Sequence, residues 1–258
     1  GFNYVITPGF SFFGNLSHGF STPTFEETLL PEGDINKNIK PETGWNAETG
    51  IRALIANRLT ASVSYYRIYV KNLLVARRTG QDAYIGVNAG QSLHPGLEAA
   101  FRLVVLERSS YPSLTVNGNA TFANYHFREF VDEGTDYSGN LLPGTTQNTW
   151  LLAANYTPVK NLKFHAWYRH TGEMPVNDAN SGFTDPYGLT NFEATYSPDF
   201  KKLKLALKAG IQNVFDVHYA AMLAVNAPSF GGKLPRYYYP GNPRNYFVSV
   251  LIGWNKKK

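Results

Sequence analysis

Arginine and tyrosine side chains recur at the ends of alternating apolar and polar segments and in the long stretches between them. Guanidinium groups form charge-assisted hydrogen bonds with anions, and they stack on flat groups as tyrosine rings do. Such residues, gathered at one end of a sheet, would hold a small anionic ligand. The candidate ligand-binding residues are Arg77, Arg78, Tyr84, Arg169, His170, Tyr187, Arg236, Tyr237 and Arg244. Arg169 is the strongest of them, because its place in the alternation puts it on a polar face.

No catalytic or metal-binding motif accompanies these residues. The sequence has no G-x-S-x-G, no H-E-x-x-H and no phosphate-binding glycine loop, and its six histidines lack metal-site spacing. It has no cysteine, which excludes disulfides and cysteine-ligated metals. We therefore predict no catalytic residue, no metal ligand and no cofactor.

Composition narrows the class of protein. Aromatic residues make up 15% of the chain and charged residues only 17%, against about a quarter in soluble domains. The formal net charge is +5, yet the basic residues are scattered and form no patch, so we expect no nucleic-acid partner. No run approaches the length of a membrane helix, and no signal peptide is visible.

Period-two alternation runs through the whole chain. One example is residues 203–211, where leucines alternate with Lys204, Ala206 and Lys208. The pattern predicts about ten strands, near 9–22, 44–56, 58–77, 84–107, 113–128, 145–157, 160–172, 187–197, 201–212 and 243–254. In the third strand the phase slips near Tyr65 and Tyr66, which predicts a β-bulge.

The connections between these segments alternate in length. Short ones fall at 56–58, 107–112, 157–160 and 197–201, and long ones at 23–43, 78–83, 129–144, 173–186 and 213–242. Outer-membrane barrels have this arrangement, with short periplasmic turns and long extracellular loops. We therefore predict an all-β, antiparallel, up-and-down transmembrane barrel with its polar rows facing the lumen.

Two polar stretches have structural interpretations instead of ligand-binding ones. In 40–43 the proline fixes the backbone before a strand, and Glu42 and Thr43 can accept hydrogen bonds from free backbone N–H groups. In 213–216 the asparagine and aspartate are expected to satisfy their own backbone at a strand end. We predict a structural role for both.

Several stretches resemble TonB-dependent outer-membrane receptors, in particular those for ferric chelates. The similar segments, in the family's order, are FGNLSHGFSTPT at 13–24, NIKPETGWNAETGIR at 38–52, NAG at 88–90 with GLE at 96–98, QNVFDVHY at 212–219 and PGNPRNY at 240–246. The resemblance implies a plugged barrel of about twenty-two strands in the outer membrane of a Gram-negative bacterium. It also implies uptake of a ferric siderophore or similar iron chelate, energised by TonB through the plug.

This resemblance implies that residues 1–258 are the C-terminal portion of such a barrel, without the plug and the N-terminal strands. The sequence departs from the family after Trp254, because Asn255 to Lys258 follow the aromatic residue that should end the chain. Ferric dicitrate, haem, cobalamin and oligosaccharides remain possible ligands. The candidate residues fit equally well an aromatic girdle with basic side chains that neutralise lipopolysaccharide, a predicted lipid partner.

A small self-contained barrel of ten strands is the alternative. It could be a passive porin or a protease, and a protease would need acidic residues and a histidine to converge at the extracellular rim. The side chains available for that role are Asp132, Asp136, Asp178, Asp185 and His170.

Overall fold

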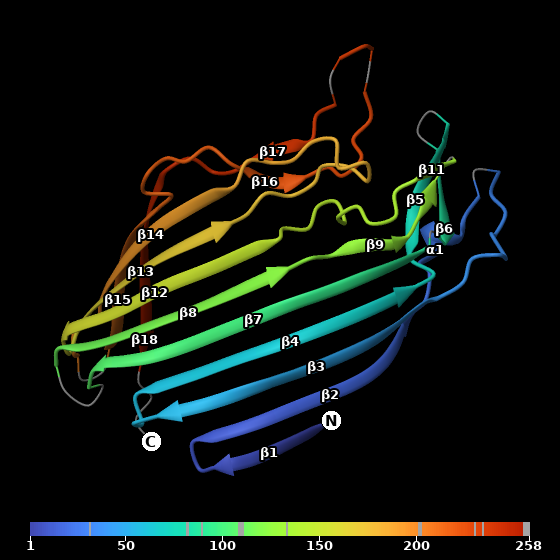
Figure 1. The fold of residues 1–258 in the computed structure, drawn as a ribbon. Coiled ribbons are helices and arrows are strands. Elements are labelled where there is room, and N and C mark those ends of the chain that lie inside the picture. The colour runs from blue at the N-terminus through green and yellow to red at the C-terminus, as the bar shows by residue number, and fades with distance from the viewer. Residues whose placement is uncertain are drawn as a thin grey trace.

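In the computed structural model the chain is an extended, curved sheet (Figure 1). The structure describes all residues except 31, 81–82, 89, 108–110, 133, 201–202, 230, 234 and 255–258, and only the backbone of 26, 76–80 and 83–84. Among the described residues no helix is long and apolar enough to cross a membrane. The residues that follow Trp254 lie outside the described part.

A single antiparallel sheet accounts for most of the described chain. Its path runs β1-β2-β3-β4-β7-β8-β12-β13-β14-β15-β18, so strands adjacent in the path are also consecutive along the chain apart from the small loop hairpins. The bounds are β1 Phe2–Thr7, β2 Phe10–Ser21, β3 Glu42–Ile55, β4 Leu59–Lys71, β7 Gln91–Leu106, β8 Ser113–Ala123, β12 Asn148–Val159, β13 Leu162–Thr171, β14 Tyr187–Tyr196, β15 Leu203–Gln212 and β18 Asn245–Trp254. Within the described residues β1 and β18 are the two sheet edges and do not pair with each other.

Short elements lie within the long connections. They are α1 Phe25–Thr28, β5 Leu74–Gly80, β6 Ala83–Asn88, β9 His126–Glu129, β10 Val131–Asp132, β11 Thr135–Asp136, β16 Ala220–Leu223 and β17 Tyr238–Pro240. The strands β5, β6 and β11 and the helix α1 lie at one end of the sheet (Figure 1), which we call the loop end. The opposite, short-turn end has tight connections such as 56–58, where Ala56 and Asn57 have φ of 50° and 52°.

The predicted alternation is present in the structure, and it separates two faces of the sheet. One, the apolar face, exposes large side chains such as Leu16 (63%), Trp45 (51%) and Val248 (79%). The other, the polar face, contains the Lys208–Glu193 ion pair at 2.9 Å. Exposed apolar rows of this extent are typical of a membrane strand, because one face must meet lipid and the other water.

Several details of the predicted strands are wrong, and one is the segment 113–128, which is divided into β8 and β9. The segment 58–77 is not one strand, since β4 ends at Lys71 and the backbone turns at Asn72, which has φ 55°. The segment 84–107 is likewise divided into β6 and β7 at Gly90, which has φ 64°. The end of the first segment and the start of the second, β5 and β6, pair with each other as a separate hairpin. Strand β1, which pairs with β2, was not predicted.

The predicted bulge at Tyr65 and Tyr66 is also wrong. Strand β4 pairs with β3 and with β7 in continuous register through both residues. Tyr65 is exposed on the apolar face, whereas Tyr66 is buried over Gly96 of the neighbouring strand. Gly96 has no side chain and therefore leaves room for the Tyr66 ring, so the strand needs no bulge to accommodate two successive tyrosines.

The stretch 40–43 has the predicted structural role. The Oε1 atom of Glu42 accepts a hydrogen bond of 2.6 Å from the backbone N–H of Leu74, at the start of β5. The Asn88 side chain accepts from the Lys40 N–H at 2.7 Å and donates to the Lys40 carbonyl at 2.9 Å. These bonds connect the base of the β5–β6 hairpin to the strand that enters the sheet.

We predict that Gly96→Ala destabilises the sheet because of Tyr66. An added Cβ would lie 2.3 Å from the tyrosine hydroxyl, and this side chain cannot swing away because its hydroxyl contacts that of Tyr125. Such overpacking costs roughly 1–3 kcal/mol. Thermal unfolding of the protein expressed from its complete gene measures the loss.

Two comparisons test the cause. Gly19→Ala, in β2, is the matched control, since an added Cβ there meets nothing within 4 Å. In a Tyr66→Ala background, Gly96→Ala should cost little. An equal cost in both backgrounds would show that the ring is not responsible.

Candidate functional site

A large hollow lies among the connections of the loop end, and we call it the loop cavity. Its volume is about 1530 Å³. It is lined by residues 73–75 at the start of β5, by parts of 127–145 between β8 and β12, by 177–179 between β13 and β14, and by parts of 224–237 between β15 and β18. Segments far apart in the sequence thus form one concave site, the usual form of a small-molecule site.

An apolar cluster forms one wall of the loop cavity. Phe127, Phe130 and Leu142 are buried, with 2%, 1% and 8% of their surface exposed. The two phenylalanine rings have centroids 4.4 Å apart, and Leu73 and Tyr137 pack against the cluster. Burial of this apolar surface fixes a connection that the sheet alone would leave free.

Asparagine side chains hold the loops against each other. Asn226 Nδ2 donates to the Asp178 carboxylate at 2.8 Å, and its Oδ1 accepts from the Asp178 N–H at 3.1 Å. Asn140 donates to the Asp178 carbonyl at 2.8 Å. Asn180 both accepts from the Leu141 N–H at 2.8 Å and donates to its carbonyl at 3.0 Å. The three connections are therefore joined by hydrogen bonds of their own.

The charges that line the loop cavity are of both signs. Lys233 and Arg236 supply positive charge, and Asp132 and Asp178 supply carboxylates. Burial raises the pKa of the Asp178 carboxyl, and the nearby charge of Asp132 adds to this, while the hydrogen bond from Asn226 acts in the opposite direction. Cationic and aromatic groups around one cavity can bind an anionic ligand of moderate size.

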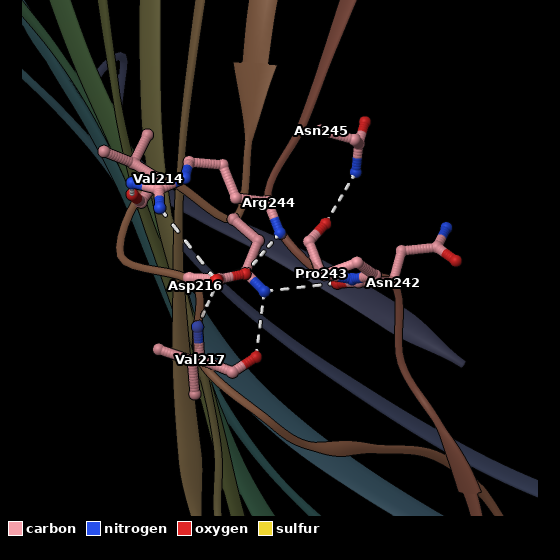
Figure 2. Close-up of polar contacts among 8 residues, drawn as sticks. Val214, Asp216, Val217, Asn242, Pro243, Arg244 and Asn245 are labelled. Atoms are coloured by element: carbon pink, nitrogen blue, oxygen red, sulfur yellow. Dashed lines mark hydrogen bonds and ion pairs between the residues drawn. The ribbon is translucent and has the colours of Figure 1, made fainter.

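A second polar cluster, built around Asn213, closes the loop end between the last strands (Figure 2). Asn213 is 3% exposed, and its Oδ1 accepts from the Val217 N–H at 2.8 Å. Its Nδ2 donates to the carbonyls of Val217 at 2.9 Å and Asn242 at 3.2 Å, and its own N–H donates to Asn191 Oδ1 at 3.0 Å. The predicted structural role of 213–216 is confirmed.

Arg244 belongs to this cluster. Its backbone N–H donates to Asp216 Oδ1 at 2.7 Å, and its guanidinium lies 3.9 Å from Asp216 Oδ2 and 3.3 Å from the Val214 carbonyl (Figure 2). These contacts connect the end of β15 to the start of β18. The residue has a structural partner here and does not line the loop cavity.

The predicted ligand residues fall into separate places. Arg236 and Tyr237 line the loop cavity. Arg169 is exposed on the polar face of β13, and the Tyr187 ring packs at a tilt against that of Tyr219, with ring centroids 4.8 Å apart. His170 lies on the apolar face, where its ring stacks on Trp150 at 5.4 Å.

The remaining candidates, Arg77, Arg78 and Tyr84, lie on the β5–β6 hairpin, where Arg78 pairs with Tyr84. Their side chains lie outside the described part of the structure.

Sequence reasoning did not identify Asp178, Asn180 or Asn226 as partners. The asparagines Asn180 and Asn226 have positive φ, of 50° and 53°, so the turn tendency of asparagine could have been used to place turns there. No local signal connects a turn at 180 with one at 141.

The polar face has a smaller hollow toward the short-turn end. It has a volume of about 660 Å³ and is lined by hydroxyl, amide and cationic side chains, among them Arg102, Asn117, Asn155 and Lys163. Across the described residues no three His, Cys, Asp or Glu side chains group as metal ligands.

An open antiparallel wall with one apolar and one polar face, short turns at one end and folded loops at the other, is part of an outer-membrane β-barrel. The family described as "TonB dependent receptor-like, beta-barrel" matches residues 1–214, and the chain belongs to this family.

Known proteins agree with this assignment. The vitamin B12 transporter BtuB of Vibrio vulnificus (strain YJ016) is 26% identical over 242 residues, which are 93% of this chain and 34% of the relative. The ferric citrate transporter FecA superimposes with a TM-score of 0.75 at 22% identity, over 97% of this chain and 37% of that one.

The ferric enterobactin receptor PfeA of Pseudomonas aeruginosa gives a TM-score of 0.75 at 18% identity, over 98% of this chain and 40% of that chain. The chain therefore spans about a third of the length of the relatives it matches. The relatives are transporters and receptors, not enzymes, as the sequence predicted.

We predict that Asn213→Ala loosens the loop end. The substitution leaves part-buried backbone groups of Val217 and Asn242 without their side-chain partner, which costs roughly 1 kcal/mol or more. Limited proteolysis of the protein expressed from its complete gene should cut 213–244 faster. Asn155→Ala, which removes an exposed amide pair of 3.2 Å with Asn117, is the control and should leave the rate unchanged. Equal rates in the two variants would contradict this role.

We predict a pH-dependent stability for the loop that carries Asp178, because burial of its carboxyl disfavours the ionised form. The pKa of Asp178 is raised in the fold, so its contribution to stability is complete below the unfolded value near 3.8 and is lost as pH rises through the folded value. Proteolysis of 172–186 should therefore accelerate between pH 4 and pH 7. In Asp178→Asn, which keeps an acceptor oxygen, this acceleration should disappear.

Asp136→Asn is the matched control, because hydrogen bonds from Ser138 lower the pKa of Asp136 and its contribution has the opposite sign. If Asp178→Asn keeps the wild-type pH profile, the Asp178 carboxyl does not set it.

Proposed function

We propose that the chain supplies wall strands and extracellular loops to an outer-membrane receptor for a ferric siderophore or similar iron chelate in a Gram-negative bacterium. Residues 1–258 would be the C-terminal portion of its barrel, and TonB would act through a plug outside this sequence. The observation that carries the proposal is the loop cavity, which several connections of the loop end enclose and which Arg236 and Lys233 make partly cationic.

The nature of the relatives supports the ligand class. Solved structures that share this fold include receptors whose names specify ferric catecholate import, ferric citrate and ferric enterobactin. Chelates of this kind carry carboxylate or phenolate oxygens, and arginine and lysine bind such oxygens by charge-assisted hydrogen bonds. Tyr137 and Tyr237 add aromatic surface to the cavity for a flat chelate.

Cobalamin uptake is the second candidate, favoured by the likeness to a vitamin B12 transporter. Removal of the cations of the loop cavity would distinguish an iron chelate from cobalamin as the ligand. An anionic chelate would lose binding energy, whereas a ligand without strong negative charge gains little from these cations.

The alternative of a small self-contained barrel has less support. Within the described residues the edge strands β1 and β18 are unpaired with each other, so this segment does not close on itself. A protease site is not assembled either. His170 lies beside Trp150 on the apolar face, while Asp132 and Asp178 line the loop cavity.

We predict that Lys233→Ala combined with Arg236→Ala weakens binding of ferric citrate or ferric enterobactin about tenfold or more. The loss corresponds to one or two charge-assisted hydrogen bonds of roughly 1.5–3 kcal/mol each. Binding is measured on the purified protein from its complete gene, together with uptake of ⁵⁵Fe-labelled chelate by cells.

Lys160→Ala is the control, since Lys160 pairs with Asp199 at 2.5 Å at the short-turn end. Cobalamin is the neutral comparison ligand. If the double variant binds every ferric chelate as the wild type does, the loop cavity is not the chelate site. Cobalamin binding that is equal in the wild type and the double variant, with no ferric chelate bound by either, would support the second candidate.

A further inference from the structure

Two cations flank one tyrosine ring on the apolar face near the loop end, and a third projects from the same face of the strand. The Arg128 guanidinium carbon lies 5.0 Å from the centroid of the Tyr69 ring, and Lys71 Nζ lies 5.5 Å from the same centroid. Arg67 is two residues before Tyr69 in β4 and therefore projects from the same face. We call Arg67, Lys71 and Arg128 the rim cluster.

The rim cluster lies where a row of aromatic side chains crosses the sheet. Tyr69 is paired with Trp45 of β3, and Trp45 is paired with His18 of β2. The His18 and Trp45 rings have centroids 4.8 Å apart, and Trp45 is 51% exposed. Amphipathic rings in this arrangement occur at the level of lipid headgroups. The cations are therefore at the height at which headgroups would contact the barrel.

Among the residues that the structure describes, no acidic side chain forms an ion pair with the rim cluster. All three of its cations are exposed. The carboxylate nearest in the pairing scheme is Glu129, whose Oε2 accepts a hydrogen bond of 2.8 Å from Gln91. Gln91 in turn accepts from the Tyr69 hydroxyl. The cluster keeps an excess of positive charge on a face that is otherwise apolar.

The side chains between the rim cluster and the middle of the sheet are apolar. Leu16 (63% exposed) and Leu97 (40% exposed) belong to this face. A ligand that fits both features has anionic groups for the cations and hydrocarbon chains for the apolar rows. Free phosphate would satisfy only the cations, whereas a phosphorylated lipid satisfies both.

We propose that the rim cluster binds the phosphate groups of lipopolysaccharide in the outer leaflet, with its acyl chains on the apolar rows below. Arginine at two of the three positions suits this role, because its planar fork binds phosphate oxygens in pairs. Tyr69 orients both flanking cations through its ring. The proposal rests on the outer-membrane placement of the proposed function, but not on the identity of the imported ligand.

The test measures lipid retention directly. The protein expressed from its complete gene is purified in detergent, mixed with bisphosphorylated lipid A and examined by native mass spectrometry. Each cation removed should weaken retention about fivefold, and Arg67→Ala with Arg128→Ala together roughly 25-fold. Arg58→Ala, an exposed arginine in the short turn 56–58, is the matched control and should retain lipid as the wild type does.

Two further arms identify the chemical source. Lipid A without phosphate should be retained weakly by every variant, and inorganic phosphate alone should not bind measurably to the wild type. Equal retention of bisphosphorylated lipid A by the double variant and the wild type would overturn the proposal. So would wild-type retention of phosphate-free lipid A as strong as that of the bisphosphorylated form, or measurable binding of inorganic phosphate alone to the wild type.

Failure here is distinct from failure of the proposed function. The rim cluster does not line the loop cavity, so the double variant should bind ferric citrate as the wild type does. Thermal unfolding of the double variant confirms that the sheet is intact.

Discussion

The backbone pairing of one long antiparallel sheet is the constraint on which the rest of the structure depends. Every peptide group at membrane depth needs a hydrogen-bond partner within the protein, because lipid offers none. Once neighbouring strands supply those partners, side chains must project alternately to the two faces. The two faces then meet different media, and the sequence pattern follows. Leucine and aromatic residues cover one face, while asparagine, lysine and glutamate cover the other.

This constraint explains why so much of the sheet could be predicted from the sequence. Residues 203–211 alternate strictly, and β15 begins at Leu203 and ends at Gln212. The alternation led to a wrong prediction where two large residues follow each other, because Tyr65 and Tyr66 point to opposite faces without the bulge that we predicted. There the register is decided by Gly96 on the neighbouring strand, which leaves space for the Tyr66 ring. A single strand's sequence cannot reveal a compensation that belongs to its partner.

The loop end could be predicted much less well, because different interactions determine it. Asn72 and Gly90 turn the chain out of the sheet by positive φ, and these local events could in principle be identified from residue type. The contacts that follow are not local. Asp178 and Asn226 are joined across 48 positions of sequence, and Asn88 reaches Lys40 over the same span. Only the arrangement of the strands beneath brings these segments together, so the loop cavity could not be predicted residue by residue.

The division between wall and loops also explains how a shared barrel can serve different ligands. The chain superimposes on FecA with a TM-score of 0.75 at only 22% identity, so the wall keeps its shape through extensive substitution. Substitutions that preserve the alternation and the space between neighbouring side chains preserve the sheet. The loops, by contrast, hold each other through their own hydrogen bonds and through the Phe127–Phe130 cluster. Their side chains can therefore change with the ligand while the clusters at Asn213 and Asn88 keep the loop bases attached to the sheet. If the loop cavity is the ligand site, as we propose, a change in ligand preference requires substitutions within that cavity and none in the wall.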